Sequence, residues 1–354
     1  MELKETLKSY KGKKIFITGH TGFKGSWLAY ILYLSGAKVT GYSLKPKNKQ
    51  DNFYLLKLDS KIKNYYSDIR NEKNLKNKIK KCKPDIIFHL AAQPLVKESY
   101  KNPKFTFSTN IIGTLNILEA ARDVKSVKSV LIITSDKCYK NYEKKSGYSE
   151  ADELGGKDPY SASKAAAENI FYSYNESFYK SKKKLGLVSV RAGNVIGGGD
   201  WSKDRIIPDL IKSIIFNKKF ILRSPKSTRP WQHVFDLLNG YLMLSKKIYG
   251  NNKYNGSWNF GPNKSHLTVK DVISGLVDIM EIKKKIFIKK DKKLKETDLL
   301  SLKINKSKKY LKWKPKLTFF QTLKMTAEWY QCFINDKKKI VELSKKQINN
   351  YFYD

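Results

Sequence analysis

The chain has 354 residues, of which 40% are hydrophobic and 13% aromatic, a composition typical of a globular protein of about two domains. It contains no run of about 18 apolar residues and no signal-peptide core, so we expect a cytoplasmic enzyme without a membrane span. The net charge of +39 arises from 71 Lys and Arg against 32 Asp and Glu. Because the lysines are scattered along the whole chain, they favour a solvated basic surface over nucleic-acid or membrane binding.

The three cysteines, Cys82, Cys138 and Cys332, are far apart, and the chain has only four histidines. This spacing predicts neither a disulfide framework nor a metal site. Cys138 follows Lys137, which can activate a thiol, but a free cysteine is more often a small buried hydrophobic residue, and we expect that here.

The first predicted unit is a strand, a glycine turn and a helix. Residues 14–18 are apolar and β-branched, and residues 26–35 form a helical run that Gly36 ends. Between them lies a Gly-x-x-Gly-x-x-Gly motif, whose glycines let the backbone approach a pyrophosphate at the helix N-terminus. We therefore expect a dinucleotide to contact Gly19, Thr21, Gly22, Phe23, Lys24 and Gly25.

Strand and helix patterns then alternate. Further strands are predicted at 37–42, 85–90, 130–134 and 187–191, with helices at 75–80, 109–122 and 161–179. Such alternation predicts an α/β fold of the Rossmann type, a doubly wound parallel sheet covered on both faces. After about residue 195 the pattern is irregular and includes a lysine-dominated stretch at 283–309. We expect a NAD(P)-binding domain mainly in 1–190 and a smaller C-terminal substrate-binding lobe mainly in 191–354, with the chain crossing between them.

The choice between NAD and NADP stays open. An acidic residue about 20 positions after the glycine turn would indicate NAD. Residues 43–47 instead read Ser-Leu-Lys-Pro-Lys, and these lysines suit a 2′-phosphate or are ordinary surface residues. Asp68 and Ile69, with Arg70, follow the next strand-like segment and are well placed to contact the adenine.

Two segments predict carbonyl chemistry. Tyr160 and Lys164 are four residues apart, so on a helix they share a face, and the ammonium is expected to lower the pKa of the phenol. Ser135, Asp136 and Lys137 end an apolar strand, at the sheet edge where ligands bind. The structural alternatives are a solvated Tyr/Lys pair, a loop cap for Asp136 and a surface position for Lys137.

Long motifs add a family resemblance. They are residues 19–27 (Gly-His-Thr-Gly-Phe-Lys-Gly-Ser-Trp), 88–96 (Phe-His-Leu-Ala-Ala-Gln-Pro-Leu-Val), 134–139 (Thr-Ser-Asp-Lys-Cys-Tyr), 191–201 (Arg-Ala-Gly-Asn-Val-Ile-Gly-Gly-Gly-Asp-Trp) and 229–234 (Arg-Pro-Trp-Gln-His-Val). In these strings the chain resembles the extended short-chain dehydrogenase/reductase family of nucleotide-sugar enzymes, in particular its CDP-glucose 4,6-dehydratase branch. The similarity runs from about residue 10 to about residue 350.

The resemblance implies a hydro-lyase reaction in three steps. Tyr160 takes the C4 hydroxyl proton while hydride passes to the nicotinamide, with Lys164 stabilising the phenolate and Ser135 hydrogen-bonding the same oxygen. Asp136 then protonates the departing C6 hydroxyl after the C5 proton is removed, and the hydride finally returns to C6. Lys137 stands where related dTDP-glucose enzymes have Glu, and it acts as the C5 base, orients Asp136, activates a water or stabilises an enolate.

The remaining contacts follow from the same resemblance. Near the nicotinamide we expect Ala91, Ala92 and Gln93, with His89 either beside it or in the core. Asn110 corresponds to the family's structural and proton-relay asparagine. The substrate is expected to contact Gln93, Ser135, Asn194, Arg205, Arg229 and His233.

The resemblance also implies a homodimer formed through the helices at 109–122 and 161–179, and a role in deoxysugar biosynthesis for an O-antigen or lipopolysaccharide. The nearest alternatives are a 4,6-dehydratase or epimerase of another nucleotide sugar (UDP, dTDP or GDP). A catalytically silent dinucleotide sensor or a nucleic-acid binder is the alternative from a different class.

Overall fold

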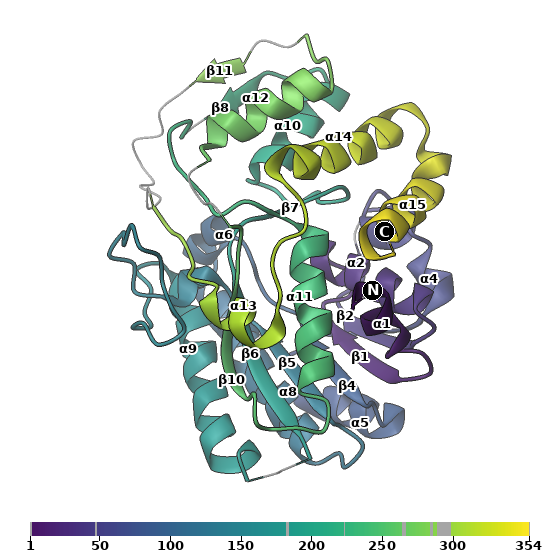
Figure 1. Ribbon diagram of the computed structural model, residues 1–354, viewed down its shortest axis with the longest axis vertical. Coiled ribbons are helices and arrows are strands. Elements are labelled where there is room, and N and C mark those ends of the chain that lie inside the picture. Colours follow the sequence, from purple (N-terminus) through teal and green to yellow (C-terminus); the bar gives the residue numbers. More distant parts are fainter. Residues whose placement is uncertain are drawn as a thin grey trace.

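The computed structural model describes residues 2–46, 48–181, 184–222, 224–263, 267–283, 286–288 and 299–353. Its centre is one sheet of seven parallel strands in the order β10-β6-β5-β4-β1-β2-β3 (Figure 1). The strands are β1 (Lys14–Thr18), β2 (Lys38–Ser43), β3 (Lys63–Tyr66), β4 (Ile86–His89), β5 (Ser129–Ile133), β6 (Gly186–Ala192) and β10 (Gly256–Phe260). The order reverses between β1 and β4, so the predicted doubly wound parallel sheet is confirmed.

Helices cover both faces of the sheet because the strand residues alternate in direction. Ile15, Ile17 and Phe88 point into the larger core with α1 (Glu2–Lys8), α2 (Phe23–Leu34) and α11 (Val234–Lys247). Phe16 and Ile87 point the other way, into a core with α5 (Glu72–Cys82), α8 (Gly113–Arg122) and α9 (Pro159–Tyr174). Strands buried on both faces account for the apolar runs in the sequence.

Two predicted helices differ from expectation in the same way. The helix expected at 109–122 begins as a π-helical turn, Ser108–Ile112, and becomes α-helical only in α8. The helix expected at 161–179 ends as α9 at Tyr174 and continues as a second π-helical turn, Asn175–Tyr179. The start of α9 follows from its sequence, because Asp158 accepts a hydrogen bond from the Ser161 amide and Pro159 occupies the first turn.

The C-terminal half of the chain adds one more strand to the sheet. Strand β10 pairs with β6 at the sheet edge and was not predicted, and α11 packs against the sheet beside α2. Above the carboxyl ends of the strands lie α10 (Ile206–Ile215), β8 (Phe220–Leu222), α12 (Val269–Ile279), β11 (Ile286–Ile288) and α14 (Phe319–Asn335) (Figure 1). Within the lysine-dominated stretch, residues 284, 285 and 289–298 lie outside the described residues, as does Lys47.

The remaining elements are short or peripheral. They are α3 (Asn52–Leu55), α4 (Leu58–Lys61), α6 (Val96–Lys101), α7 (Pro103–Phe107), β7 (Val195–Ile196), β9 (Gln232–His233), α13 (Asn305–Leu311) and α15 (Ile340–Phe352). Strand β7 pairs with β9, and β8 pairs with β11.

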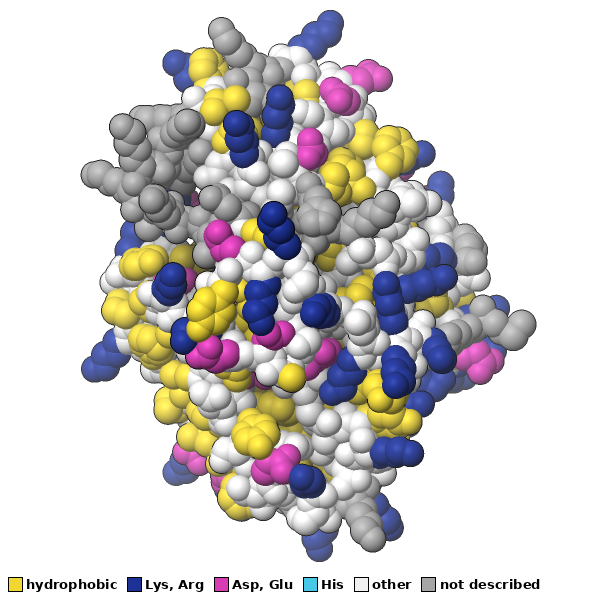
Figure 2. All heavy atoms as spheres, turned by 60° about the vertical axis from the view of Figure 1, so that its left-hand side comes forward, with side chains coloured by type: hydrophobic (Ala, Val, Ile, Leu, Met, Phe, Trp, Pro, Cys, Tyr) yellow, Lys and Arg dark blue, Asp and Glu magenta, His cyan; other side chains and the backbone are white. Residues whose placement is uncertain are grey.

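Charge is spread over the surface. On the face shown in Figure 2, Lys and Arg side chains are distributed among acidic and apolar ones over the whole view. In the described part of the chain, no helix is long and apolar enough to cross a membrane.

Candidate active site

A cavity of about 790 Å³ opens at the carboxyl ends of β1, β4 and β5, below β8 and α10. Its lining includes nearly every residue singled out in the sequence: Gly19, Thr21, Gly22, Phe23, Lys24, Gly25, Asp68, Ile69, Ala91, Ala92, Gln93, Ser135, Asp136, Lys137, Tyr160, Lys164, Asn194, Arg205 and Arg229. Asn110 and His233 are not among its lining residues. Side chains from widely separated segments therefore meet in one place.

The glycine turn forms one wall of the cavity. Gly19 has a left-handed backbone (φ +72°), and a Cβ on Gly25 would lie 2.1 Å from the Gly19 carbonyl oxygen, so a side chain is excluded there. Gly22 is the N-cap of α2, and no side chain caps this helix terminus. An uncapped helix N-terminus on a cavity wall is suited to binding an anion.

Three cations surround the middle of the cavity. Burial, together with the positive charges of Arg205 and Lys164, lowers the pKa of Lys24 to about 7, while Asp136 and Asp200 oppose this shift. Arg205 donates a hydrogen bond from Nη1 to Asp200 Oδ2 at 2.9 Å. The cavity is therefore electropositive where the turn, α9 and the start of α10 meet.

Tyr160 and Lys164 both line the cavity from α9, but among the described residues no hydrogen bond joins the ammonium to the phenol. Lys164 Nζ donates to the Ile133 carbonyl oxygen at 3.4 Å, and burial lowers the pKa of Lys164 to about 8. Burial raises the pKa of Tyr160 to about 12, opposed by a hydrogen bond with Ser135 and by the charge of Arg205. The expectation that Lys164 lowers the phenol pKa is therefore wrong for this structure, because desolvation of the phenol dominates.

Ser135, Asp136 and Lys137 follow β5 directly. Ser135 Oγ donates to Asp136 Oδ1 at 3.0 Å and accepts from the Lys137 amide at 3.2 Å, which caps the short 3₁₀ turn Asp136–Cys138. Asp136 is 3% exposed, and its Oδ2 has no hydrogen-bond partner among the described residues. Burial raises the pKa of Asp136, while Lys137, Ser135 and Arg229 lower it. A buried carboxyl with a raised pKa retains its proton more readily, as a general acid must.

The adenine side of the cavity is lined by short polar contacts. Asp68 Oδ2 accepts from Arg70 Nη2 at 2.7 Å, and this pair is partly exposed. Thr21 Oγ1 lies 2.9 Å from Ser43 Oγ and donates to the Leu44 carbonyl oxygen at 3.1 Å. Ser43 and Leu44 thus occupy the wall where an acidic residue would mark NAD.

The loop that carries Gln93 is held in place by several hydrogen bonds, including those from Asn110. Gln93 Nε2 donates to Thr106 Oγ1 at 2.8 Å, and its Oε1 accepts from the Leu95 amide at 2.6 Å. Asn110 Oδ1 accepts from the Gln93 amide at 2.8 Å, and Asn110 Nδ2 donates to Ser163 Oγ at 2.8 Å. Asn110 therefore ties the Gln93 loop to α9 from behind the cavity wall.

Both of the predicted histidines are buried behind the site. His89 is hydrogen-bonded to Thr18 and Thr114 within the sheet layer, and it does not line the cavity. His233 accepts a hydrogen bond at Nδ1 from the Phe235 amide at 3.2 Å, so it caps α11. Burial lowers the pKa of each to about 3, and both rings are neutral at physiological pH.

Asn194, Arg205 and Arg229 line the part of the cavity that faces the C-terminal half of the chain. The sequence reading missed Thr109, whose buried Oγ1 on this wall has no partner among the described residues, and Asp200, which holds Arg205. Asp200 lies within the 191–201 motif, so the sequence motif could have identified it. Thr109 has no sequence signal, because only the fold brings it to the cavity.

The chain matches known proteins over most of its length. The family model described as GDP-mannose 4,6 dehydratase matches residues 16–326. A CDP-glucose 4,6-dehydratase of Salmonella typhimurium is 40% identical over 97% of both chains, and a dTDP-D-glucose 4,6-dehydratase of Dictyostelium discoideum is 31% identical over 69% of this chain and 58% of its own.

Solved structures show the same fold. The dTDP-glucose 4,6-dehydratase of Bacillus anthracis in complex with NAD has a TM-score of 0.75 and 24% identity, with 90% of this chain and 96% of its own covered. The UDP-glucose 4-epimerase of Thermotoga maritima has a TM-score of 0.80 and 22% identity, with 91% and 99% covered. The chain therefore belongs to the GDP-mannose 4,6 dehydratase family of extended short-chain dehydrogenases/reductases.

Proposed function

We propose that this protein is an NAD-dependent CDP-glucose 4,6-dehydratase, which converts CDP-D-glucose to CDP-4-dehydro-6-deoxy-D-glucose and water. The observation that carries the proposal is the presence of Asp136, buried with an unpartnered carboxyl oxygen, in the same cavity as Tyr160 and Lys164. A simple 4-epimerase needs the tyrosine but no second acid. The similarity over nearly the full length of the Salmonella enzyme supports CDP-glucose as the substrate.

The cavity suits a dinucleotide. The uncapped N-terminus of α2 at Gly22 and the glycines of the turn, Gly19 and Gly25, would let the backbone hold its pyrophosphate, and Asp68 and Ile69 its adenine end. Ala91, Ala92, Tyr160 and Lys164 would contact the nicotinamide half. When bound, NAD accepts the two electrons released at C4 and returns them at C6. Ser43 and Leu44 stand where an acidic residue would contact the ribose hydroxyls of NAD. The experiment should therefore compare NADP with NAD.

Tyr160 serves as the base for the C4 hydroxyl. Its oxygen takes that proton as the carbonyl forms. The charge of Arg205 favours the phenolate that must precede the transfer, and Ser135 would favour it too once its hydroxyl turns from Asp136 to the phenol oxygen. Lys164 remains largely protonated below its pKa of about 8 and supplies positive charge behind the site.

Asp136 and Lys137 serve the elimination. The 4-keto group acidifies the C5 proton, Lys137 removes it or orients its acceptor, and Asp136 gives its proton to the C6 hydroxyl, which leaves as water. C5 takes a proton back when the hydride returns to C6. The raised pKa of Asp136 favours the protonated form that this step consumes. Asn194, Arg205 and Arg229 would bind the diphosphate, for which guanidinium groups have a suitable geometry.

The test is incubation with CDP-glucose and with its UDP, dTDP and GDP counterparts, each with NAD or NADP. We expect CDP-glucose with NAD to give the alkali absorbance of a 4-keto-6-deoxy sugar, with Tyr160→Phe protein as the blank. A C4 epimer without loss of water, or turnover of another nucleotide sugar alone, would contradict the assignment.

We also propose a cytoplasmic homodimer that contributes to deoxysugar biosynthesis for an O-antigen or lipopolysaccharide. Exposed apolar side chains on the two long helical segments, Ile112 (42%), Tyr172 (65%) and Phe178 (37%), support a contact between two copies there. In each subunit, residues 1–190 would mainly bind the cofactor and residues 191–354 mainly the substrate. Light scattering that gives the mass of a monomer would contradict the dimer.

A further inference from the structure

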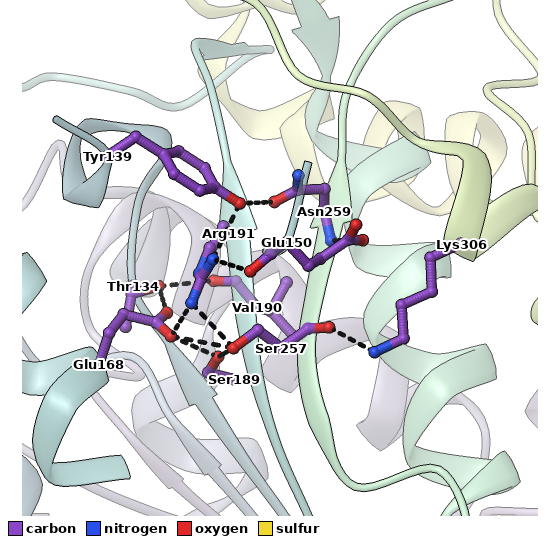
Figure 3. A network of polar contacts seen from close by, with 10 residues as sticks. All are labelled: Thr134, Tyr139, Glu150, Glu168, Ser189, Val190, Arg191, Ser257, Asn259 and Lys306. Atoms are coloured by element: carbon purple, nitrogen blue, oxygen red, sulfur yellow. Dashed lines mark hydrogen bonds and ion pairs between the residues drawn. The ribbon is translucent and has the colours of Figure 1, made fainter. Parts of the chain in front are cut away.

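A buried polar network includes the two residues that flank the segment 135–138, Thr134 and Tyr139 (Figure 3). Its centre is an ion pair between Glu168 on α9 and Arg191 on β6, with a distance of 2.7 Å from Arg191 Nη2 to Glu168 Oε2. The side chains are 0% and 4% exposed, respectively. Glu168 follows Tyr160 and Lys164 at intervals of four residues, so all three lie along one stripe of α9. The helix that carries the proposed base therefore also carries the buried carboxylate.

Glu168 holds the start of the catalytic loop. Its Oε1 accepts a hydrogen bond from the Thr134 hydroxyl, and its Oε2 accepts from Ser189 Oγ at 2.8 Å in addition to Arg191. Thr134 is the last residue before Ser135, and its amide also donates to the Val190 carbonyl oxygen at 2.9 Å. The carboxylate thus joins α9 to the end of β5.

Arg191 holds the other end of the same loop. Its Nη1 donates to the Tyr139 hydroxyl at 2.9 Å, and its guanidinium carbon lies 4.9 Å from the centre of the Tyr139 ring. The Tyr139 hydroxyl donates in turn to Asn259 Oδ1 at 2.8 Å, which extends the link to β10. Figure 3 shows Arg191 between Glu168 and Tyr139.

The two partners, Thr134 and Tyr139, are the residues immediately before and after the segment 135–138. We propose that the Glu168–Arg191 pair positions the catalytic segment: it fixes both ends of residues 135–138 relative to the α9 stripe that presents Tyr160 and Lys164. This inference rests on the proposed function, since it assigns the pair the task of keeping the acid, Asp136, in register with the base, Tyr160.

A stabilising role alone does not account for this arrangement. A buried ion pair generally contributes little net stability compared with apolar residues of the same volume, because both charges are desolvated. Here Glu168 accepts four hydrogen bonds, and Arg191 donates to Tyr139 as well. These partners come from the end of β5, β6, β10 and the loop after Cys138, all of which border the site. Fixing several independent segments with one pair gives the preorganisation that a reaction at C4, C5 and C6 requires.

The charge of Glu168 also supports the site, because it favours the charged form of Lys164. It raises the pKa of Lys164 and so opposes the burial that lowers it. The other titratable groups whose interaction with Lys164 is resolved are Cys138 on the catalytic segment, Lys24 on α2 and His89 on β4. Glu168 is the strongest of the influences that favour the charged ammonium.

The experiment compares Glu168→Gln with Asp236→Asn in the full-length protein. Both replace a buried carboxylate by an amide, but Asp236 lies on α11 and bonds to Tyr351 and the Lys316 amide, outside the network and the cavity. We expect Glu168→Gln to speed amide hydrogen exchange in residues 134–139 and to lower kcat about 100-fold with little change in KM. Asp236→Asn should leave both the exchange of that segment and kcat unchanged.

Two milder variants keep the test decisive if Glu168→Gln does not fold. Thr134→Val and Tyr139→Phe each remove one hydroxyl and leave the ion pair intact, so each should loosen one end of the segment and lower kcat. Unchanged exchange in residues 134–139, or faster exchange with wild-type kcat, would overturn the inference. Wild-type protein without turnover of any sugar nucleotide would contradict the proposed function instead, and the exchange data would still decide whether the pair holds the loop.

Discussion

At the scale of single residues, the proposed reaction gives two tasks, those of base and acid, to two side chains. Tyr160 carries a pKa raised to about 12 by burial, and Asp136 a pKa raised by the same cause. For an acid this shift is useful, since it keeps the proton in place. For a base it is unfavourable, because the shift makes the phenolate about 3 kcal/mol harder to form than that of an ordinary tyrosine. The site must therefore supply compensating positive charge around the phenolate.

Replacing the phenol tests the first task. Tyr160→Phe keeps the ring in its buried position but removes the oxygen that we propose accepts the C4 proton. We expect kcat to fall by about 10³-fold or more, because a general base contributes about that much. Steady-state rates at saturating CDP-glucose measure this loss, with the thermal midpoint as a control for folding. A variant within tenfold of wild type would exclude Tyr160 as the base.

Replacing the carboxyl tests the second task. Asp136→Asn is isosteric and leaves the C4 oxidation possible, but the amide cannot donate the proton that the C6 hydroxyl needs. We expect slow appearance of reduced nicotinamide absorbance without any 4-keto-6-deoxy product. Stopped-flow absorbance and the alkali assay on the same sample separate the two steps. Unchanged product yield would remove Asp136 from the mechanism.

At the scale of elements, local patterns were sufficient for the main strands and helices before about residue 195. The β1–turn–α2 unit followed from the apolar strand and the three glycines, and α9 from Tyr160 and Lys164 after an Asp-Pro start. Strand β10 was not predicted because its residues, Gly-Ser-Trp-Asn-Phe, contain no β-branched apolar run, and it is stabilised by pairing with β6, about 70 positions earlier in the chain. Both π-helical turns also lack a local sequence signal.

The site was predictable as a set of residues but not as a set of contacts. The apolar strand before Asp136 and the helix start before Tyr160 predicted that both residues lie at one edge of the sheet, and both line the cavity there. The hydrogen bonds of Asn110 with the Gln93 loop and of His233 with α11 depend on tertiary packing. The same holds for the phenol pKa, since desolvation depends on everything packed around Tyr160 and not on its neighbours in sequence.

The glycine turn gives a prediction for an element. Gly25→Ala would place a Cβ 2.1 Å from the Gly19 carbonyl oxygen, which is backbone and cannot move aside. We expect a loss of about 3 kcal/mol in stability and no rise of the thermal midpoint on addition of NAD. Gly261→Ala is the control, because its Cβ would have ordinary contacts at 3.7 Å. A Gly25→Ala protein that NAD still stabilises as it does wild type would contradict this account of the turn.

At the scale of the whole molecule, the buried titratable groups are distributed across both cores. His20 lies behind the glycine turn, His89 in β4 and His233 at the start of α11, and burial lowers their pKa values to about 4, 3 and 3. Asp236 on α11 shifts the opposite way, because burial raises its pKa to about 6. Tyr351 donates to its carboxylate at 2.7 Å, which secures the C-terminal helix to α11.

These groups predict acid lability with a defined sign. Below about pH 6.5 the unfolded chain protonates its histidines and the folded protein does not, so stability is lost as the pH falls, by about 2 kcal/mol per histidine at pH 5. Protonation of Asp236 and of Asp209, whose pKa burial also raises to about 6, favours the folded state over the same range, and together they offset about 2 kcal/mol. We therefore expect a net loss of about 4 kcal/mol between pH 7 and pH 5, measured by urea unfolding at constant salt. His233→Asn retains a good N-cap for α11 and removes one of the three titrations, so its loss should be smaller by about 2 kcal/mol. Equal stability of wild type at the two pH values, or an identical loss in His233→Asn, would show that these rings titrate in the folded protein as they do in the unfolded chain.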